Sequence, residues 1–337
     1  MFYIITIIFL AIILYKSKLV EWNKEYLDKK YTNSIKGICA VMVVMNHMFE
    51  EARLWGILAV AMFFFYSGYG LMQGYCNKEN YFKGFWKKRI KKVLLPFWIT
   101  NVIYILVYIF VKNNSYTASE IVLSFFNASI MTTGWYIIAA IIMYAIFYIV
   151  FKYLKTSNTK KIILNMILIF CYIILARFVG CKSWWYTSIL GFGLGLIWAY
   201  KKSSINKLCK QYIYVNVCLF IALYSLPYLL GKFDGIIIGL SNMILCIVFI
   251  FFMNSISMKV KICNKILNFI GNISLEMYLI HPLVIKTLGF SEILKIVEFL
   301  FIIVVSKIYN FCLKKIYNDN SIRGKNESKN NSINANL

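Results

Sequence analysis

The chain has 337 residues, of which 61% are hydrophobic and only 15% are charged, and its formal net charge is +24. A soluble domain carries more charge and has shorter apolar runs, so this composition excludes a soluble enzyme and indicates a membrane protein. The positive charge suits anionic lipid headgroups rather than nucleic acid, because the sequence shows no basic, aromatic-rich soluble domain.

Apolar stretches close to the roughly 20 residues that a membrane-spanning helix requires recur along the whole chain. They predict an all-α fold, a polytopic membrane helical bundle of ten or eleven transmembrane helices, of which the first two are short. In chain order we expect these spans near residues 2–15, 35–49, 57–75, 93–111, 135–153, 162–178, 184–200, 212–230, 235–253, 266–285 and 290–313.

Three parts are expected along the chain. Residues 1–30 form an additional N-terminal membrane helix and a cytoplasmic linker, residues 31–313 form the main membrane domain, and residues 314–337 form a tail. The first apolar stretch is not a cleavable signal peptide, because Lys16 and Lys18 follow it instead of preceding it. The tail is rich in Asn, Ser and Lys, a composition that predicts disorder.

The distribution of Lys and Arg predicts the orientation of the bundle. Alternate connections, together with the C-terminal tail, carry twenty-nine of these residues. The intervening loops carry one each, namely Arg53, Lys112, Lys182, Lys232 and Lys286. Because basic connections remain in the cytoplasm, we expect a multi-pass protein with a cytoplasmic C-terminus and an N-terminus outside.

The sequence does not predict a metal site. Its nine cysteines are scattered mainly through the apolar stretches without a Cys-x-x-Cys pattern, and the chain has only two histidines. Zinc and iron sites need clusters of these residues at short spacings, so the cysteines are expected to be small buried apolar residues.

Both histidines, His47 and His281, lie inside apolar stretches. An ionisable side chain in the hydrocarbon layer costs a few kcal/mol or more, so it indicates a functional site. Lys36 precedes His47 by eleven residues, which on a helix places both within about 20° of one face and roughly 16 Å apart. Glu50 follows His47 by three residues, a helical spacing that would let it orient the ring. The structural alternative is that Lys36 extends to the inner headgroups and His47 is hydrogen-bonded to another helix.

A second polar stripe lies in the tenth predicted span. Ser274, Tyr278 and His281 follow one another at i, i+4 and i+7 and therefore share one face of a helix. Glu276 lies nearly opposite, and we expect it to pair within the bundle because a carboxylate facing lipid is unfavourable. Pro282 can distort the helix directly after the histidine.

Small residues and one basic stretch each allow two interpretations. Ser67, Gly68 and Gly70 can allow close helix packing, and for the glycines at 191, 193, 195, 235 and 239 packing is the interpretation that we favour. The stretch 87–92 holds five basic residues directly before an apolar span. Topology and lipid contact explain it, and binding of a phosphate-bearing cofactor from the cytosol is the functional alternative.

Taken in this order, the motifs resemble the membrane-bound acyltransferase 3 family of bacterial O-acyltransferases over residues 31–310. Five elements carry the resemblance: residues 36–47 (Lys, ten residues, His), 63–69, 88–97, 134–136 and 271–282. The chain departs from the family at Lys36, where the family usually has Arg, and Lys cannot form a bidentate guanidinium contact. The helix expected at 2–15 is additional to the common ten-helix core.

The resemblance implies an enzyme, an O-acyltransferase of the bacterial inner membrane. It would move an acyl group, acetyl or succinyl, from cytoplasmic acyl-CoA to a hydroxyl of a cell-surface glycan or lipid-linked sugar. Acetyl-CoA is the donor that we expect first, and no metal is expected to take part. Some relatives carry a fused extracellular esterase-like domain, which this chain lacks. The membrane domain would therefore act alone or with a separate envelope-biosynthesis protein.

The resemblance also implies roles for individual residues. His47 would be the catalytic base, with Glu50 beside it. Basic residues would attract or orient the CoA donor: Lys36, Lys88, Arg89 and Lys92. The substrate site would be lined by Ser67, Tyr136, Ser274, Tyr278 and His281. Because Lys36 and His47 lie near opposite membrane surfaces, we expect a polar cavity that penetrates the bundle between them.

Two other classes of function compete with this one. The chain could export a lipid-linked sugar or small solute, or it could be a non-catalytic subunit of a polysaccharide synthesis complex. Many secondary transporters contain internal repeats, and the sequence shows no detectable repeat.

Overall fold

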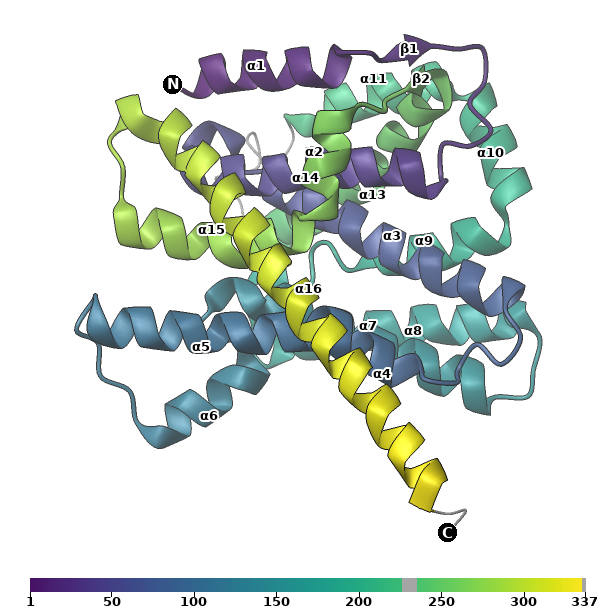
Figure 1. Cartoon of the computed structure of the whole chain (residues 1–337). Helices are drawn as coiled ribbons and strands as arrows, with labels where there is room; N and C mark the ends of the chain where they lie inside the picture. Colours follow the sequence, from purple (N-terminus) through teal and green to yellow (C-terminus); the bar gives the residue numbers. More distant parts are fainter. Residues whose placement is uncertain (226–234, 335–337) are drawn as a thin grey trace.

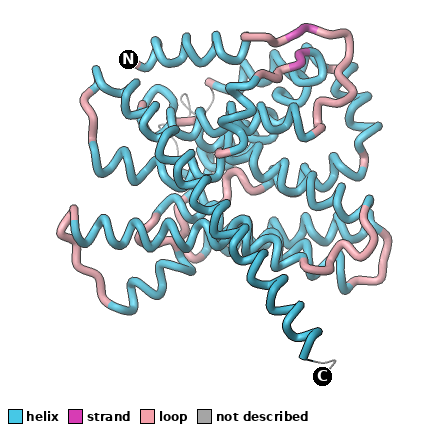
Figure 2. Tube along the Cα trace, in the orientation of Figure 1, coloured by secondary structure: helices cyan, strands magenta, loops and turns pink. Residues whose placement is uncertain are grey.

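The computed structural model describes residues 1–225 and 235–334, and most of them are helical (Figures 1 and 2). The all-α fold predicted from the composition is confirmed. Within the described residues the strands are β1 (Lys18–Leu19) and β2 (Val260–Lys261), which pair antiparallel.

The main helices follow the apolar stretches of the sequence. They are α1 (Phe2–Leu14), α2 (Lys29–Met48), α3 (Trp55–Asn77), α4 (Phe85–Arg89), α5 (Leu95–Phe110), α6 (Ala118–Asn127), α7 (Trp135–Tyr153), α8 (Asn158–Phe178), α9 (Leu190–Tyr200), α10 (Lys202–Gln211), α11 (Ile213–Tyr224), α13 (Gly235–Lys259), α14 (Lys265–Asn272), α15 (Ser274–Leu288) and α16 (Lys295–Asn334). Single 3₁₀ turns lie between some of them, at Glu50–Ala52, Thr132–Gly134, Ser183–Trp185 and Glu292–Leu294.

Six helical segments in the described part of the chain are long and apolar enough to cross a membrane. They are Trp55–Asn77, Phe85–Phe110, Ala118–Tyr153, Asn158–Phe178, Ile237–Lys259 and Glu292–Tyr317. Helices α1 and α11 are apolar but shorter. Several apolar helices of this length fit a multi-pass membrane protein.

Two predicted spans differ from the observed helices because of local chain chemistry. The span at 93–111 begins earlier, since α4 continues through a π-helical turn at Ile90–Leu94 into α5. Pro96 accounts for the wider turn, because its ring would clash with the carbonyl four residues back and it has no N–H to donate. The span at 266–285 is interrupted at Ile273, between α14 and α15.

Other boundaries shift or were missed. The helix in the span at 184–200 begins only at Leu190, and the span at 212–230 corresponds to α11. The end of that span and Lys232 lie outside the described residues. Helices α6 and α10 were not predicted. Thr117 and Glu120 form a capping box at the start of α6, a signal that the sequence does contain.

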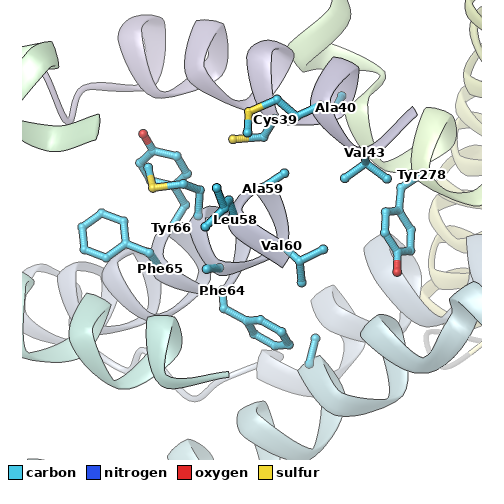
Figure 3. Close-up of a cluster of buried hydrophobic side chains, with 14 of the residues drawn as sticks. Cys39, Ala40, Val43, Leu58, Ala59, Val60, Phe64, Phe65, Tyr66 and Tyr278 are labelled. Atoms are coloured by element: carbon cyan, nitrogen blue, oxygen red, sulfur yellow. The ribbon is translucent and has the colours of Figure 1, made fainter. Parts of the chain in front are cut away.

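Helices α2 and α3 form an antiparallel pair at the centre of the bundle (Figure 1). The amide of Gly56, at the start of α3, donates to the Asn46 side chain near the end of α2 (3.2 Å). Small and apolar side chains of both helices fill the space between them, as Figure 3 shows for Cys39, Ala40, Val43, Leu58, Ala59 and Val60. We call the end of the bundle that holds the N-terminus of α2 and the C-terminus of α3 the basic end, and the opposite end the histidine end.

Glycine allows α2 to touch α14 backbone to backbone. A Cβ added to Gly37 would lie 2.2 Å from the carbonyl oxygen of Leu267, and one added to Gly271 would lie 1.9 Å from that of Asn33. The Asn33 amide also donates to the carbonyl of Asn268 (2.9 Å). Two sequence motifs that are more than 230 residues apart are therefore locked together beside Lys36.

Glycines also allow α3 and α9 to pack backbone to backbone. A Cβ at Gly68 would lie 2.0 Å from the carbonyl oxygen of Phe192, and one at Gly195 would lie 2.2 Å from that of Phe65. The packing role predicted for these glycines is confirmed. It is not seen for Gly70, Gly235 and Gly239, because no atom of the described residues lies within 4 Å of a Cβ at those positions.

The N-terminal helix α1 lies along the outside of the bundle, antiparallel to α2 (Figure 1). Its first residue, Phe2, packs on Phe49 at the histidine end (ring centres 5.6 Å apart). At its other end, Asn264 donates to the carbonyl oxygens of Ile12 (2.8 Å) and Tyr15 (3.2 Å). Helix α1 thus extends from the histidine end towards the basic end.

The C-terminal helix α16 crosses the bundle diagonally (Figure 1). It is helical to Asn334, whereas the composition of residues 314–337 predicts disorder. An apolar first half that packs on α15 provides the nucleus, and a polar segment can extend a helix once that nucleus exists.

We expect Gly37→Ala to destabilise the protein by about 1–3 kcal/mol, because α2 must move away from the Leu267 carbonyl to accommodate the methyl group. Gly70→Ala in α3 is the matched control, since open space surrounds its Cβ position and Ala favours the helix. Thermal unfolding of the purified protein in detergent compares them. Equal melting temperatures for the two variants would contradict the close-approach argument.

Candidate active site

A pocket at the level of Lys36 lies between α2, α3, α7 and α15. We call it the Lys36 pocket; its volume is about 250 Å³, and its polar lining residues are Lys36, Tyr66, Ser67, Tyr136, Tyr144, Ser274 and Tyr278. Five of the predicted site residues meet here, although they come from four helices that are distant in sequence. The tertiary structure therefore brings together the motifs that the sequence showed separately.

Lys36 supplies the positive charge of this pocket. Its Nζ lies 5.7 Å from the centre of the Tyr66 ring, a cation–π contact. The described residues form a single ion pair, Lys295 with Glu298, so within them Lys36 has no carboxylate partner. A half-buried ammonium group without a counter-ion favours an anionic or strongly polarised ligand in the pocket.

Arg89 lies next to the Lys36 pocket. Its guanidinium stacks on the Phe85 ring at 3.8 Å and donates to the Tyr81 hydroxyl (2.9 Å). The Arg89 Cζ also lies 6.0 Å from the ring centre of Tyr144, which lines the pocket. Burial raises the pKa of Tyr81, so its hydroxyl stays protonated while it accepts the hydrogen bond from Arg89.

A second pocket lies at the histidine end. We call it the His47 pocket; its volume is about 420 Å³, within the range of small-molecule sites. Polar and aromatic side chains in its lining include Asn46, His47, Arg53, Trp135, Trp184 and Lys286. The His47 side chain is exposed to this space. No acidic side chain of the described chain lines the pocket.

The two histidines come together, although 234 positions separate them. Their ring centres are 4.9 Å apart. His281 is fully buried, and its Nδ1 lies 2.9 Å from the carbonyl oxygen of Met277. A carbonyl only accepts, so we assign the proton to Nδ1, which leaves Nε2 of the neutral ring as an acceptor. That Nε2 has no hydrogen-bond partner among the described residues.

Tyr278 is the wall shared by the two pockets. It is buried, and its hydroxyl donates to the carbonyl oxygen of Thr133 (2.8 Å). Figure 3 shows Tyr278 at the edge of the α2–α3 cluster. The polar cavity expected from the sequence is thus present as two compartments that meet at one side chain, instead of one continuous passage.

Glu50 does not lie beneath the His47 ring, which corrects the expected arrangement. Helix α2 ends at Met48, and Phe49 is extended (φ −140°, ψ 130°), so the three-residue helical spacing is not formed. Glu50 instead lines a separate pocket with Glu51 and Glu292. The sequence placed it wrongly because the end of the helix was expected later.

Lys88 and Lys92 are exposed and line neither of the two pockets. Among the basic residues expected to orient a donor, Lys36 lines the Lys36 pocket. Arg89 does not line it but lies beside the ring of Tyr144, which does. The pocket residues Tyr144, Trp135 and Trp184 were missed. Trp135 stands inside the motif at 134–136, a signal that was available, whereas nothing around Tyr144 distinguishes it from other aromatic residues of the span.

Glu276 points away from both pockets and pairs within the bundle, as predicted. Its carboxylate accepts a hydrogen bond from the Asn310 side chain of α16 (2.7 Å), and both residues are buried. This contact anchors α15, which carries Tyr278 and His281, to α16.

Comparison with protein families matches residues 29–308 to the acyltransferase 3 family, described as an acyltransferase domain. The matched part begins with the first residue of α2 and includes every residue that lines the two pockets. It leaves out α1. No curated protein and no solved structure matches the chain.

We expect Asn310→Leu to lower the free energy of unfolding by about 1–3 kcal/mol, because the Glu276 carboxyl would stay buried without its donor. In the double variant Glu276→Met/Asn310→Leu both polar groups are replaced, and most of that loss should be regained. Thermal unfolding in detergent measures both variants. A double variant as unstable as the single one would mean that Glu276 has another essential partner.

Proposed function

Because this chain belongs to the acyltransferase 3 family, we propose that it is an integral membrane O-acyltransferase that uses acyl-CoA to acylate a hydroxyl of a cell-surface or lipid-linked glycan. Membership makes the chain a membrane acyltransferase. The donor, the acceptor and the direction of transfer are the proposal.

One observation carries it. A single helix, α2, supplies Lys36 to one pocket and His47 to another, and the two pockets share the wall formed by Tyr278. The eleven residues between Lys36 and His47 correspond to roughly 16 Å of helix, about half of the hydrocarbon thickness. A donor from one side and an acceptor from the other can meet only at such a central wall.

The Lys36 pocket suits the acyl end of the donor. Its volume of about 250 Å³ is small, and acetyl or succinyl groups are small acyl chains. The Lys36 ammonium can contact a thioester carbonyl or a phosphate oxygen as a point charge. Exposed Lys88 and Lys92 near this end increase the local concentration of the anionic CoA.

The His47 pocket suits a sugar hydroxyl. The indole rings of Trp135 and Trp184 offer apolar faces against which the C–H faces of a sugar ring pack. Asn46, Arg53 and Lys286 provide hydrogen-bonding groups around the same space. A few placed polar groups in an aromatic-lined pocket are typical of sites that orient one small ligand.

His47 acts as the general base in this proposal. Its unprotonated ring nitrogen takes the proton of the acceptor hydroxyl while the hydroxyl oxygen attacks the thioester carbonyl. The new C–O bond forms, the C–S bond breaks, and the CoA thiolate takes the proton from the imidazolium. Nε2 of His281 can accept the N–H of His47 and hold the productive tautomer. Direct transfer requires the thioester to pass Tyr278.

The orientation follows from charge. The basic end faces the cytoplasm, where acyl-CoA is present, and the C-terminus lies on the same side. Phe2 packs on Phe49, so the N-terminus lies at the histidine end, and in this proposal that end faces the outside of the bacterial cell membrane. A separate envelope-biosynthesis protein can present the glycan at that end.

We expect His47→Ala to remain in the membrane and to lose acyl transfer by about 10²–10⁴-fold, the usual contribution of a general base. Transfer of labelled acetyl from acetyl-CoA to envelope glycan, in membranes from expressing cells, measures this. Glu51→Gln is the control at the same end of the bundle, since Glu51 does not line the His47 pocket. Near-normal transfer by His47→Ala would refute the assignment.

Lys36→Ala should weaken apparent acyl-CoA affinity by about tenfold or more, because the pocket loses its charged contact. Lys36→Arg should restore the affinity, because Arg keeps the charge. Lys30→Ala is the control, an exposed lysine on the same helix that does not line the pocket. Equal acyl-CoA affinity in the Ala, Lys and Arg forms at position 36 would leave Lys36 with a topological role alone.

A further inference from the structure

A third pocket opens at the basic end, beyond the Lys36 pocket. We call it the Lys78 pocket; its volume is about 360 Å³, and it is lined mainly by Tyr75, Lys78, Tyr81, Phe82, Lys83 and Lys152. Three of these residues are cationic and three are aromatic. Glu79 belongs to the same loop but does not line the pocket, and no other carboxylate of the described chain does.

The loop between α3 and α4 is shaped so that its lysines meet in one place. Asn80 has a left-handed backbone (φ 48°), which Asn tolerates better than most residues. The amide of Lys83 then donates back to the carbonyl of Asn80 (2.9 Å), and this turn brings Lys83 round towards Lys78. Lys152 arrives from the end of α7, so the three charges come from two separate chain segments.

This combination favours a ligand that carries both phosphate and an aromatic ring. Three lysines around one space repel one another until an anion is bound there. The rings of Tyr81 and Phe82 are 5.5 Å apart and lie edge to face (70°), and those of Tyr75 and Phe82 are 5.9 Å apart and tilted (50°). A nucleobase can stack on such rings while its phosphates contact the lysines.

Arg89 connects the Lys78 pocket to the Lys36 pocket. It donates to the hydroxyl of Tyr81, which lines the former, and lies beside the ring of Tyr144, which lines the latter. Its guanidinium has five N–H donors. Among the described residues it donates two hydrogen bonds, one to the Tyr81 hydroxyl and one to the Phe85 carbonyl. Donors therefore remain for an anion that lies between the pockets.

Helices α3 and α7 each contribute residues to both pockets, so the distance between the pockets can be taken from the helical rise. Helix α3 supplies Ser67 to the Lys36 pocket and Tyr75 to the Lys78 pocket. Helix α7 supplies Tyr144 and Lys152 in the same way. Each pair is eight residues apart, which corresponds to about 12 Å along the helix. A ligand that fills both pockets needs an anionic aromatic head and a slender arm of that reach.

We propose that the Lys78 pocket binds the 3′-phosphoadenosine end of the acyl-CoA donor. The adenine packs against Tyr81 and Phe82, with its face on one ring and its edge towards the other, and the 3′-phosphate lies among Lys78, Lys83 and Lys152. The pyrophosphate lies at Arg89, and the pantetheine arm follows α3 and α7 into the Lys36 pocket. This assignment rests on the proposed acyl-CoA donor and adds where, and by which phosphate, the protein recognises it.

The test compares the binding of CoA and dephospho-CoA, which differ only in the 3′-phosphate. The full chain is placed in phosphatidylcholine nanodiscs, and isothermal titration measures the affinity for each ligand. The variant is Lys78→Gln/Lys83→Gln/Lys152→Gln. The matched control, Lys155→Gln/Lys160→Gln/Lys201→Gln, removes three exposed charges from the same end of the bundle without touching the pocket.

The wild-type protein and the control should prefer CoA to dephospho-CoA by about tenfold or more, the effect of losing one charged phosphate contact. The pocket variant should bind both ligands equally and bind CoA about tenfold or more weakly than wild type. Comparable melting temperatures for all three proteins show that folding is intact.

Other results would overturn the assignment and can be told apart. If wild type binds CoA but the pocket variant keeps the same preference, the site is elsewhere and the proposed donor stands. If wild type does not distinguish the two ligands, the 3′-phosphate is not recognised. If wild type binds neither, the acyl-CoA donor itself is wrong. If the pocket variant and wild type bind CoA equally in phosphatidylcholine nanodiscs and differ only in nanodiscs that also contain phosphatidylglycerol, the three lysines bind lipid headgroups and not CoA.

Discussion

The charge of Lys36 is the constraint on which the rest of the structure depends. An ammonium group inside an apolar helical bundle needs polar neighbours, and the described residues offer Lys36 no carboxylate. The chain resolves this with a polar pocket between four helices, lined by hydroxyl groups and aromatic rings. The pocket keeps the cation available to a ligand, whereas an ion pair would neutralise it.

Close backbone packing makes that pocket possible. Gly37 and Gly271 bring α2 against α14, and Gly68 and Gly195 bring α3 against α9, at distances that a Cβ would forbid. These contacts hold two sides of the bundle rigid, so the third side, facing α7 and α15, can remain open. Without a hydrophobic driving force between helices in lipid, such contacts are a main source of cohesion.

Separation of the two pockets follows from the same architecture. Tyr278 is held by its hydrogen bond to Thr133, and its helix α15 is anchored to α16 through Glu276 and Asn310. Tyr278 therefore separates the two compartments, so that they do not form one continuous aqueous path. In a membrane acyltransferase such a barrier keeps water away from the reacting groups.

The sequence by itself determined the helical membrane class, the position of most helices and the family, because apolar length, charge asymmetry and short motifs are local properties of the chain. It also placed Lys36 and His47 on one face of one helix. Only the tertiary structure decided that His281 lies 4.9 Å from His47 and that Tyr278 divides the cavity. It also moved Glu50 into a different pocket. Contacts between helices depend on where each helix ends and where two backbones can touch. The sequence around Phe49 does not show that α2 ends there, and Gly271 alone does not show which helix will pack against it.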